Sequence, residues 1–253
     1  MSRTLAFTRL ASLAAVVACG ASLAQEIFPA DPIAGEQVVF TQVLCRPSMP
    51  TWLESSSATL GPGTLNFVLD FDGGDFSVGS CARGSVVSPP LPAGTLLVRF
   101  SSGEELPVEP SVLRTLQVPA TSPASPRYTG LSGNYFDPAS SGTGVNLIQG
   151  ESGMLFAAWF TYAPANDAEP SAPLWLVMPS GKWLAPDRFR GLLYVTTGSP
   201  MNRAWSTNDL DVTPAGVLTL TFDTSRQVRF EAVALHPGFP TFSSSSTLNR
   251  FAF

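Results

Sequence analysis

Lysine and histidine are nearly absent from this chain: Lys182 and His236 are the only residues of their types among 253. Charged residues make up 13% of the sequence, about half of the share that is usual in soluble proteins. The formal net charge is −5. Because nucleic-acid binding relies on clustered Lys and Arg to neutralise phosphates, this composition predicts no nucleic-acid partner.

Metal-binding patterns are also missing. With one His and no Cys-x-x-Cys or His-x-x-His spacing, the sequence has no zinc motif. Asp70, Asp72 and Asp75 bring three carboxylates together as calcium requires, but the distal glutamate of an EF-hand loop is not there. Asp and Gly are the ordinary residues of turns, so we interpret Asp72–Asp75 as a hairpin turn and expect neither a metal nor another cofactor.

Catalytic patterns are equally scarce. There is no Gly-x-Ser-x-Gly turn and no glycine-rich phosphate loop ahead of a helix. A Ser–His–Asp triad would have to use His236, which precedes a proline in a stretch typical of a loop. Paired carboxylates for glycoside hydrolysis stay open, because spacing along the chain does not give their separation in space. The candidates are Asp137, Asp167, Glu169 and Asp187.

The first 24 residues have the pattern of a secretory signal peptide. Arg3 and Arg9 supply the positive start, an apolar stretch follows, and small residues precede a cleavage position after Ala24. We therefore predict a secreted or periplasmic protein, whose formal charge becomes −7 once Arg3 and Arg9 are removed. A second interpretation stays open: Val16–Cys19 loosely resembles a lipoprotein box, in which Cys19 would carry the lipid and attach the protein to the envelope.

Two cysteines, Cys45 and Cys81, remain after the leader on either interpretation. An even pair in an exported protein predicts a disulfide bond, which here would close a loop of 36 residues. The alternative is two buried free thiols, which pack as small apolar groups.

Helical patterns are absent after the leader, since no segment repeats apolar residues at i, i+3, i+4 and i+7. Pro (23 residues) and Gly (21 residues) are plentiful instead, which favours short strands and turns. No apolar run of about 18 residues follows the leader, so we expect no transmembrane helix.

Composition divides the mature chain into two parts. Residues 119–127 are rich in Pro, Ser and Ala and cannot bury enough surface to fold, so we interpret them as a linker. Residues 26–118 contain six or seven short alternating runs, which predicts a β-sandwich. Within them, Leu91–Phe100 (LPAGTLLVRF) resembles a segment near the end of bacterial immunoglobulin-like modules, and the resemblance implies an Ig-like sandwich.

Residues 128–253 hold nine strand candidates, most of them joined by short turns. Consecutive strands with short connections form antiparallel meanders, and eight or nine of them tend to curl and close. We predict an all-β domain that forms a small barrel or a strongly curled sheet. The expected strands are 131–136, 143–149, 154–162, 173–179, 189–198, 208–214, 217–223, 227–235 and 247–253.

Several motifs follow one another in this second part. They are Gly133–Pro138 (GNYFDP), Ser141–Gly144 (SGTG), Trp159–Tyr162 (WFTY), Pro173–Leu176 (PLWL) and Leu248–Phe251 (LNRF). Together they resemble a β-rich module of exported proteobacterial proteins, over about residues 130–253. The resemblance implies export and a β fold, and it assigns no catalytic residue.

Aromatic residues are the main candidates for ligand binding. Trp159, Tyr162, Trp175 and Trp183 lie close together in the sequence. Flat rings on a β surface can stack on sugars or anchor a partner protein. Core packing is the competing interpretation for each of them.

The hairpin that carries Trp159 and Trp175 is apolar on both faces. By parity, Leu155 and Trp159 share one side of the first strand, while Phe156 and Phe160 share the other. A strand with one wet face should alternate apolar with polar residues, and this one does not. We expect one face to fill the barrel and the other to be covered by the first domain, another subunit or a ligand.

These features predict an exported, non-catalytic β-rich protein. It would bind an unknown surface ligand or protein, or be associated with the envelope. The alternatives are a secreted, carboxylate-dependent hydrolase of glycosidase type and a structural lipoprotein.

Overall fold

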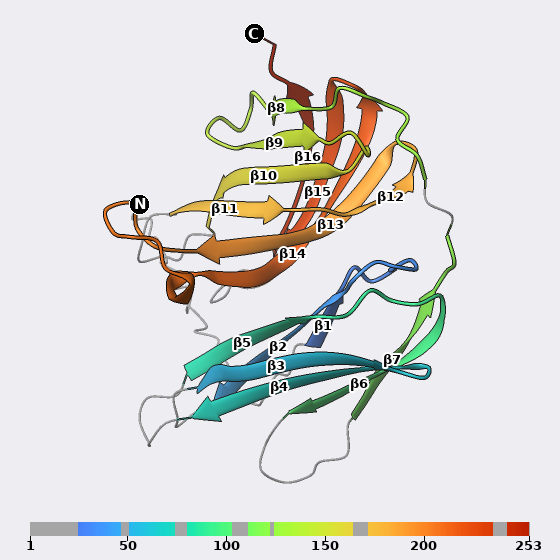
Figure 1. Cartoon of the computed structure of the whole chain (residues 1–253), viewed down its shortest axis with the longest axis vertical. Helices are drawn as coiled ribbons and strands as arrows, with labels where there is room; N and C mark the ends of the chain where they lie inside the picture. The colour runs from blue at the N-terminus through green and yellow to red at the C-terminus, as the bar shows by residue number, and fades with distance from the viewer. Residues whose placement is uncertain are drawn as a thin grey trace, which may run out of the picture.

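The computed structural model describes residues 25–46, 51–73, 80–102, 111–121, 124–163, 172–234 and 242–252. Figure 1 shows two β structures along the long axis. The strands up to Val118 form a sandwich, and the strands from Gly133 onward form a barrel. The one helical element among the described residues is a 3-10 turn, η1 (Thr207–Asp209). No helix in these ranges has the length and apolar character needed to span a bilayer. The predicted leader, with Cys19, and His236 lie outside them.

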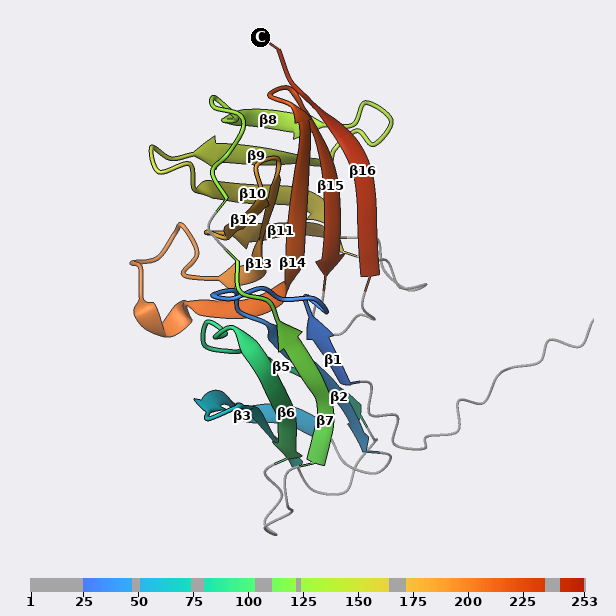
Figure 2. The same ribbon diagram turned by 90° about the vertical axis from the view of Figure 1, so that its right-hand side faces the viewer.

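The sandwich contains two sheets, ordered β1-β2-β5 and β3-β4-β6-β7 (Figure 2). Its strands are β1 (Gln25–Phe28), β2 (Val39–Arg46), β3 (Thr51–Gly61), β4 (Thr64–Gly73), β5 (Ser80–Val87), β6 (Gly94–Ser102) and β7 (Ser111–Val118). On β4, Leu65, Phe67 and Leu69 are fully buried, and the residues between them are partly exposed. Phe67 stacks on Phe40 of the opposite sheet with ring centroids 4.9 Å apart, which joins the two sheets through one core. The predicted sandwich is confirmed.

Two features of the sandwich were not anticipated. β4 and β6 run parallel, whereas immunoglobulin sheets are antiparallel. We also expected the turn Asp72–Asp75 to fold β4 back onto β5. The prediction of this hairpin is wrong, because β4 pairs with β3 and β6, whereas β5 pairs with β2 in the other sheet. β4 and β5 therefore belong to different sheets, and a local turn pattern does not specify which sheet the next strand joins.

β2 and β5 bring the two cysteines opposite each other. Cys45 and Cys81 are Cα partners in this antiparallel pair, and their side chains lie outside the described ones. Directly opposed residues have Cα atoms about 4.5–5.5 Å apart, within the about 4.4–6.8 Å that a disulfide spans. The backbone register therefore fits the predicted disulfide.

Thiol titration tests this bond. In a chain that begins at Gln25, denatured without reductant, we expect no free thiol, because Cys45 and Cys81 are the only cysteines left. The same titration after reduction should find both. Free thiols in the unreduced sample would contradict the disulfide.

The barrel is an antiparallel meander closed on itself, as predicted. Neighbouring strands follow the order β11-β10-β9-β8-β16-β15-β14-β13, β11 also pairs with β13 to close the ring, and β12 attaches beside β13. The strands are β8 (Gly133–Phe136), β9 (Gly144–Gln149), β10 (Leu155–Tyr162), β11 (Pro173–Met178), β12 (Lys182–Ala185), β13 (Arg188–Thr197), β14 (Asp211–Thr224), β15 (Gln227–Ala234) and β16 (Phe242–Arg250). Inward side chains fill the interior, as is usual for eight strands.

Two short contacts close the ring. β11 meets β13 at one pair, Val177 with Tyr194. β8 pairs with β16 at two positions near the C-terminus, Phe136 with Asn249 and Tyr135 with Arg250. Because β8 is only four residues long, it pairs only with the end of β16, and the part of β16 from Phe242 to Leu248 extends beyond it (Figure 2).

Candidate functional site

The sandwich and the barrel share an apolar contact. Val39 of β2 packs with Leu192 and Val217 on the outer side of β13 and β14. Phe28 and Tyr194 pack against this cluster. The sandwich therefore covers part of the barrel's outer surface.

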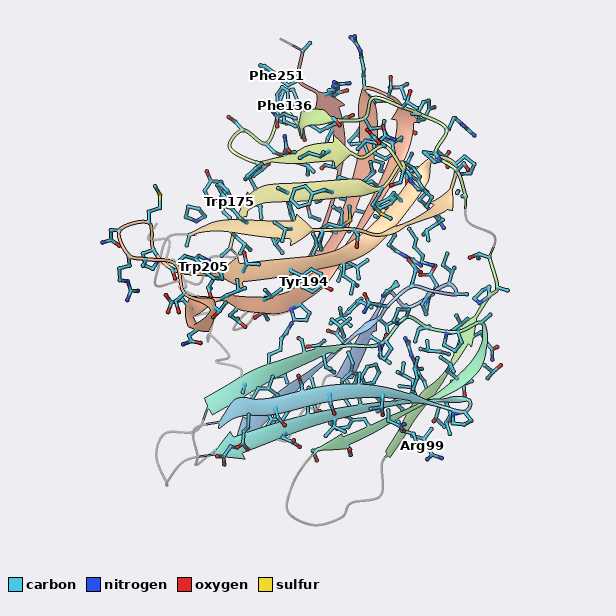
Figure 3. The ribbon with its side chains drawn as sticks, viewed as in Figure 1. Arg99, Phe136, Trp175, Tyr194, Trp205 and Phe251 are labelled. Carbon is cyan, nitrogen blue, oxygen red and sulfur yellow. The ribbon has the colours of Figure 1, made fainter. Side chains whose placement is uncertain are left out.

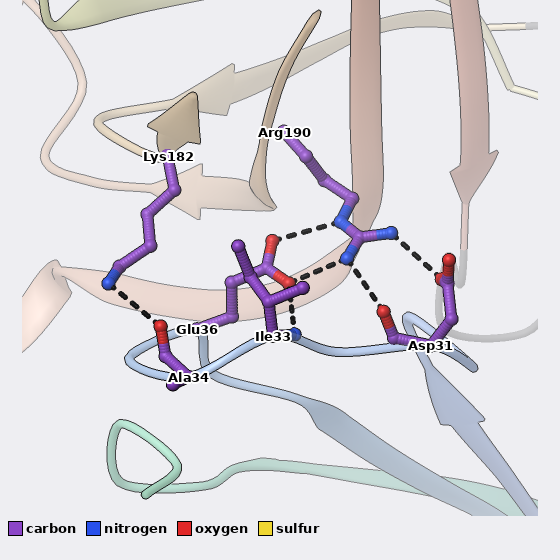
Figure 4. Close-up of polar contacts among 6 residues, drawn as sticks. All are labelled: Asp31, Ile33, Ala34, Glu36, Lys182 and Arg190. Carbon is purple, nitrogen blue, oxygen red and sulfur yellow. Dashed lines mark hydrogen bonds and ion pairs between the residues drawn. The ribbon is translucent and has the colours of Figure 1, made fainter. Parts of the chain in front are cut away.

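An ion-pair network lies beside this contact (Figure 4). Arg190 of β13 donates from Nε and Nη2 to the two carboxylate oxygens of Glu36, at 2.9 and 2.6 Å. It also donates to the side chain and the carbonyl of Asp31, at 2.8 and 2.9 Å. Lys182 Nζ donates to the carbonyl of Ala34 at 3.2 Å. The loop between β1 and β2 is thus tied to the barrel by two cations.

The central pair of this network, Arg190 with Glu36, is both charged and buried. The side chains of Arg190 and Glu36 are 8% and 7% exposed. Burial by itself lowers the pKa of Arg190, but the hydrogen bonds and charges of Glu36 and Asp31 outweigh it and raise that pKa. A cavity of about 190 Å³ lies alongside, lined by both parts of the chain. Since its arginine and its glutamate already pair with each other, we assign these groups a structural role.

Tyr194, on the side of the barrel that faces the sandwich (Figure 3), gives the fold a predicted pH dependence. Burial raises the pKa of its phenol. In the unfolded chain this phenol ionises near pH 10, approximately its ordinary pKa. Its contribution to stability is therefore complete below that pH and is lost as the pH rises through the higher folded-state pKa. Urea unfolding in this alkaline range should lose stability more steeply in the native chain than in Tyr194→Phe; equal slopes would contradict this origin.

The four aromatic residues selected from the sequence do not form one surface. Trp159 points into the barrel, is 5% exposed, and meets Phe230 with ring centroids 4.9 Å apart. Trp183 is half-buried against the barrel core and donates its Nε1 hydrogen to the carbonyl of Gly153 at 2.9 Å. These two rings therefore belong to the inner side of the barrel.

Tyr162 and Trp175 lie on the outer side and are 46% and 65% exposed, and Figure 3 shows Trp175 at the surface. The parity prediction for β10 is thus confirmed, with Trp159 inside and Phe160 outside. Phe160 and Trp175 meet edge to face at 87°. Of the three covers considered for this outer face, the first domain instead contacts β13 and β14, where Arg190 binds Glu36 of the sandwich.

A second cavity, of about 300 Å³, opens beside β16, and we name it the barrel-wall pocket. Its apolar side chains are Val145, Trp159, Phe230 and Leu248. Hydroxyl groups surround them, from Ser140, Thr143, Thr161, Ser244, Ser245 and Ser246. Asp137, whose Oδ1 accepts from the backbone N–H of Ala139 at 2.9 Å, is the one charged residue in this lining.

The register of β16 turns two of these serines inward. Leu248 is buried opposite Val228 of β15, and Ser246 and Ser244 have the same parity as Leu248. They stand opposite Phe230 and Ala232, whose side chains belong to the barrel core. Among the described residues, neither serine hydroxyl is hydrogen-bonded to a protein group. The pocket thus offers hydroxyls that are not already used by the fold.

The chemistry available in this pocket is binding. Its described lining contains no His, Lys or Cys, and a serine without a neighbouring base is a weak nucleophile. Of the four acids considered for hydrolysis, Asp137 lies here, and Asp187 lies 4.0 Å from Arg127 elsewhere. Asp167 and Glu169 lie outside the described residues. Across the described ranges, no group of three or more His, Cys, Asp or Glu side chains is placed to hold a metal.

Comparisons with protein-family models, with curated proteins and with solved structures found no match to this chain. The functional interpretation therefore depends on the geometry of the chain itself. The resemblance to an exported proteobacterial module stays an expectation.

Sequence reasoning missed Ser244 and Ser246. The run Phe242–Ser246 (FSSSS) has four consecutive serines and no alternation of apolar with polar residues, so it was not expected to be a strand. The sequence did contain one signal for these serines. Side chains alternate between the two faces of a strand, so Ser244, Ser246 and Leu248 lie on the same face of any strand that includes them.

Proposed function

We propose that this chain is an exported, non-catalytic binding protein whose barrel-wall pocket holds a small molecule. The observation that carries the proposal is the lining of the pocket, which combines the rings of Trp159 and Phe230 with the hydroxyls of Ser244 and Ser246, which have no hydrogen-bond partner among the described residues. Small-molecule sites combine an apolar lining with a few placed polar groups, and about 300 Å³ is at the lower end of their usual volume. The signal-like leader and the resemblance of residues 130–253 support export.

A carboxylate-dependent hydrolase has less support. Glycosidases need two carboxyl groups about 5–10 Å apart around the scissile bond. Each of the two cavities characterised above is lined by a single acidic residue, Asp137 in one and Glu36 in the other. Glu36 is already bound by Arg190.

The binding function is tested by NMR on the uniformly ¹⁵N-labelled chain without its leader. The five tryptophans give five indole N–H signals, and Trp159→Phe assigns the one from the pocket. The probe is a library of small neutral, cationic, anionic and apolar compounds. We expect some of them to shift the Trp159 signal and leave Trp175 unchanged. A library that moves only Trp175, or no signal at all, would contradict the proposal.

A further inference from the structure

The barrel-wall pocket has a definite charge preference. No Lys or Arg is among its described lining residues, and Asp137 contributes the one charge, which is negative. A bound phosphate, sulfate or carboxylate would face this carboxylate without a cation to balance it. The site therefore disfavours anionic ligands.

Hydroxyl side chains define what the pocket can recognise. Each Ser or Thr hydroxyl donates one hydrogen bond and accepts others, so it pairs with ligand hydroxyls in either direction. Ser244 and Ser246 are the two inward hydroxyls on β16, and Thr161 lines the pocket from β10. Asp137, with Oδ1 engaged in its own turn, can accept a further hydrogen bond from a ligand hydroxyl through Oδ2.

The inner end of the pocket is apolar. Trp159 and Phe230 meet there at 60°, and Leu248 and Val145 complete the lining. A ligand that fills the space must present C–H groups to this end and hydroxyls to the strands and the turn. Sugar rings have this division between an apolar face and a polar edge, which is why aromatic side chains bind them.

The size of the pocket suits one ring. A volume of about 300 Å³ lies at the lower end of the range for small-molecule sites, and it accommodates one six-membered ring with its hydroxyls.

From this lining we infer that the barrel-wall pocket takes a neutral, polyhydroxylated ring of the size of one monosaccharide, an inference that rests on the binding function proposed above. The ring lies with its apolar face toward Trp159 and Phe230. Its hydroxyls bond Ser244, Ser246 and Asp137.

The test uses three sets of probes on the mature chain. Neutral methyl glycosides of glucose, galactose and mannose are titrated by calorimetry beside glucuronate, which adds a carboxylate to the same ring, and glucosamine, which adds an amine. We expect at least one neutral glycoside to bind and the anionic ring to bind at least about tenfold more weakly, equivalent to about 1.4 kcal/mol.

Matched variants locate the binding. Ser246→Ala and Ser244→Ala each remove one hydroxyl and leave Cβ in place, and each should weaken glycoside binding by about tenfold. Ser243→Ala is the control, because Ser243 lies on the opposite face of β16 and does not line the pocket. It should leave binding unchanged.

Two results would overturn the inference in different ways. If charged or purely apolar compounds bind in a Ser246-dependent manner and neutral glycosides do not, the ligand class is wrong and the binding function stands. If neither the glycosides nor any library compound binds in a Ser246-dependent manner, the binding function fails as well. Glycoside binding that survives Ser246→Ala but is lost in Trp175→Ala would move the site to the outer surface.

Discussion

Arg190→Ala should lower the free energy of unfolding by about 3–5 kcal/mol, the usual effect of removing one partner from a buried ion pair. The substitution leaves Glu36, which is 7% exposed, without the two hydrogen bonds that Arg190 donates to its carboxylate. Because the network joins the barrel to the sandwich, we expect the two parts to unfold in separate steps. Urea unfolding followed by tryptophan fluorescence and circular dichroism measures both effects.

Arg127→Ala is the matched control for this variant. The Arg127–Asp187 pair is 4.0 Å apart with side chains 58% and 34% exposed, so its loss should cost at most about 1 kcal/mol. The double variant Arg190→Met with Glu36→Leu removes both charges and should be more stable than Arg190→Ala. If Arg190→Ala lowers the free energy of unfolding no more than Arg127→Ala does, the network does not hold the two parts together.

Gly216→Ala should be about as damaging, with an expected loss of about 2–6 kcal/mol from backbone strain and overpacking combined. Gly216 has φ +136°, a conformation that an alanine rarely adopts, and a Cβ there would overlap the carbonyl oxygen of Val233 on β15. The residue lies at a bulge, where the pairing of β13 with β14 shifts between Leu193 and Tyr194. The bend that it allows is part of how the barrel closes.

Gly198→Ala provides the comparison for this glycine. A Cβ at Gly198 meets no atom within 4 Å, and its φ lies outside the left-handed range. We expect a change within about 0.5 kcal/mol, as for most surface substitutions. Equal midpoints for the two variants in thermal unfolding would contradict the importance of the bulge.

Gly216 also explains one error in the sequence-based prediction. Pro214, Ala215 and Gly216 resemble a turn, so two strands were expected at 208–214 and 217–223. In the structure these residues form the bulge inside a single strand, β14. Turns and bulges use the same residues, and only the partner strands decide between them.

Most barrel strands could nevertheless be predicted, because alternation along a strand is a local property. β10 is the clearest case, since parity correctly separated Trp159 from Phe160. In the sandwich, the exposed strand β3 (Thr51–Gly61) has no such signal, because its centre is Glu54–Thr59 (ESSSAT), which has no apolar repeat.

The candidate site was less predictable, because it depends on contacts between distant segments. The barrel-wall pocket combines Asp137 from a turn, Trp159 from β10 and Ser246 from β16. Trp159 was a candidate from the sequence because its ring was expected on an exposed surface. In the structure its side chain is buried, at the inner end of the pocket. The Arg190–Glu36 pair joins residues 154 positions apart, and no spacing rule links them.

The central claim is that the barrel-wall pocket is a ligand site. A crystal structure of the chain that begins at Gln25, soaked in a concentrated mixture of neutral methyl glycosides, tests it most directly. We predict one sugar ring within hydrogen-bonding distance of Ser246 Oγ, with its apolar face toward Trp159 and Phe230. Ordered water alone in this pocket, with the glycoside bound at Trp175 or nowhere, would contradict the account.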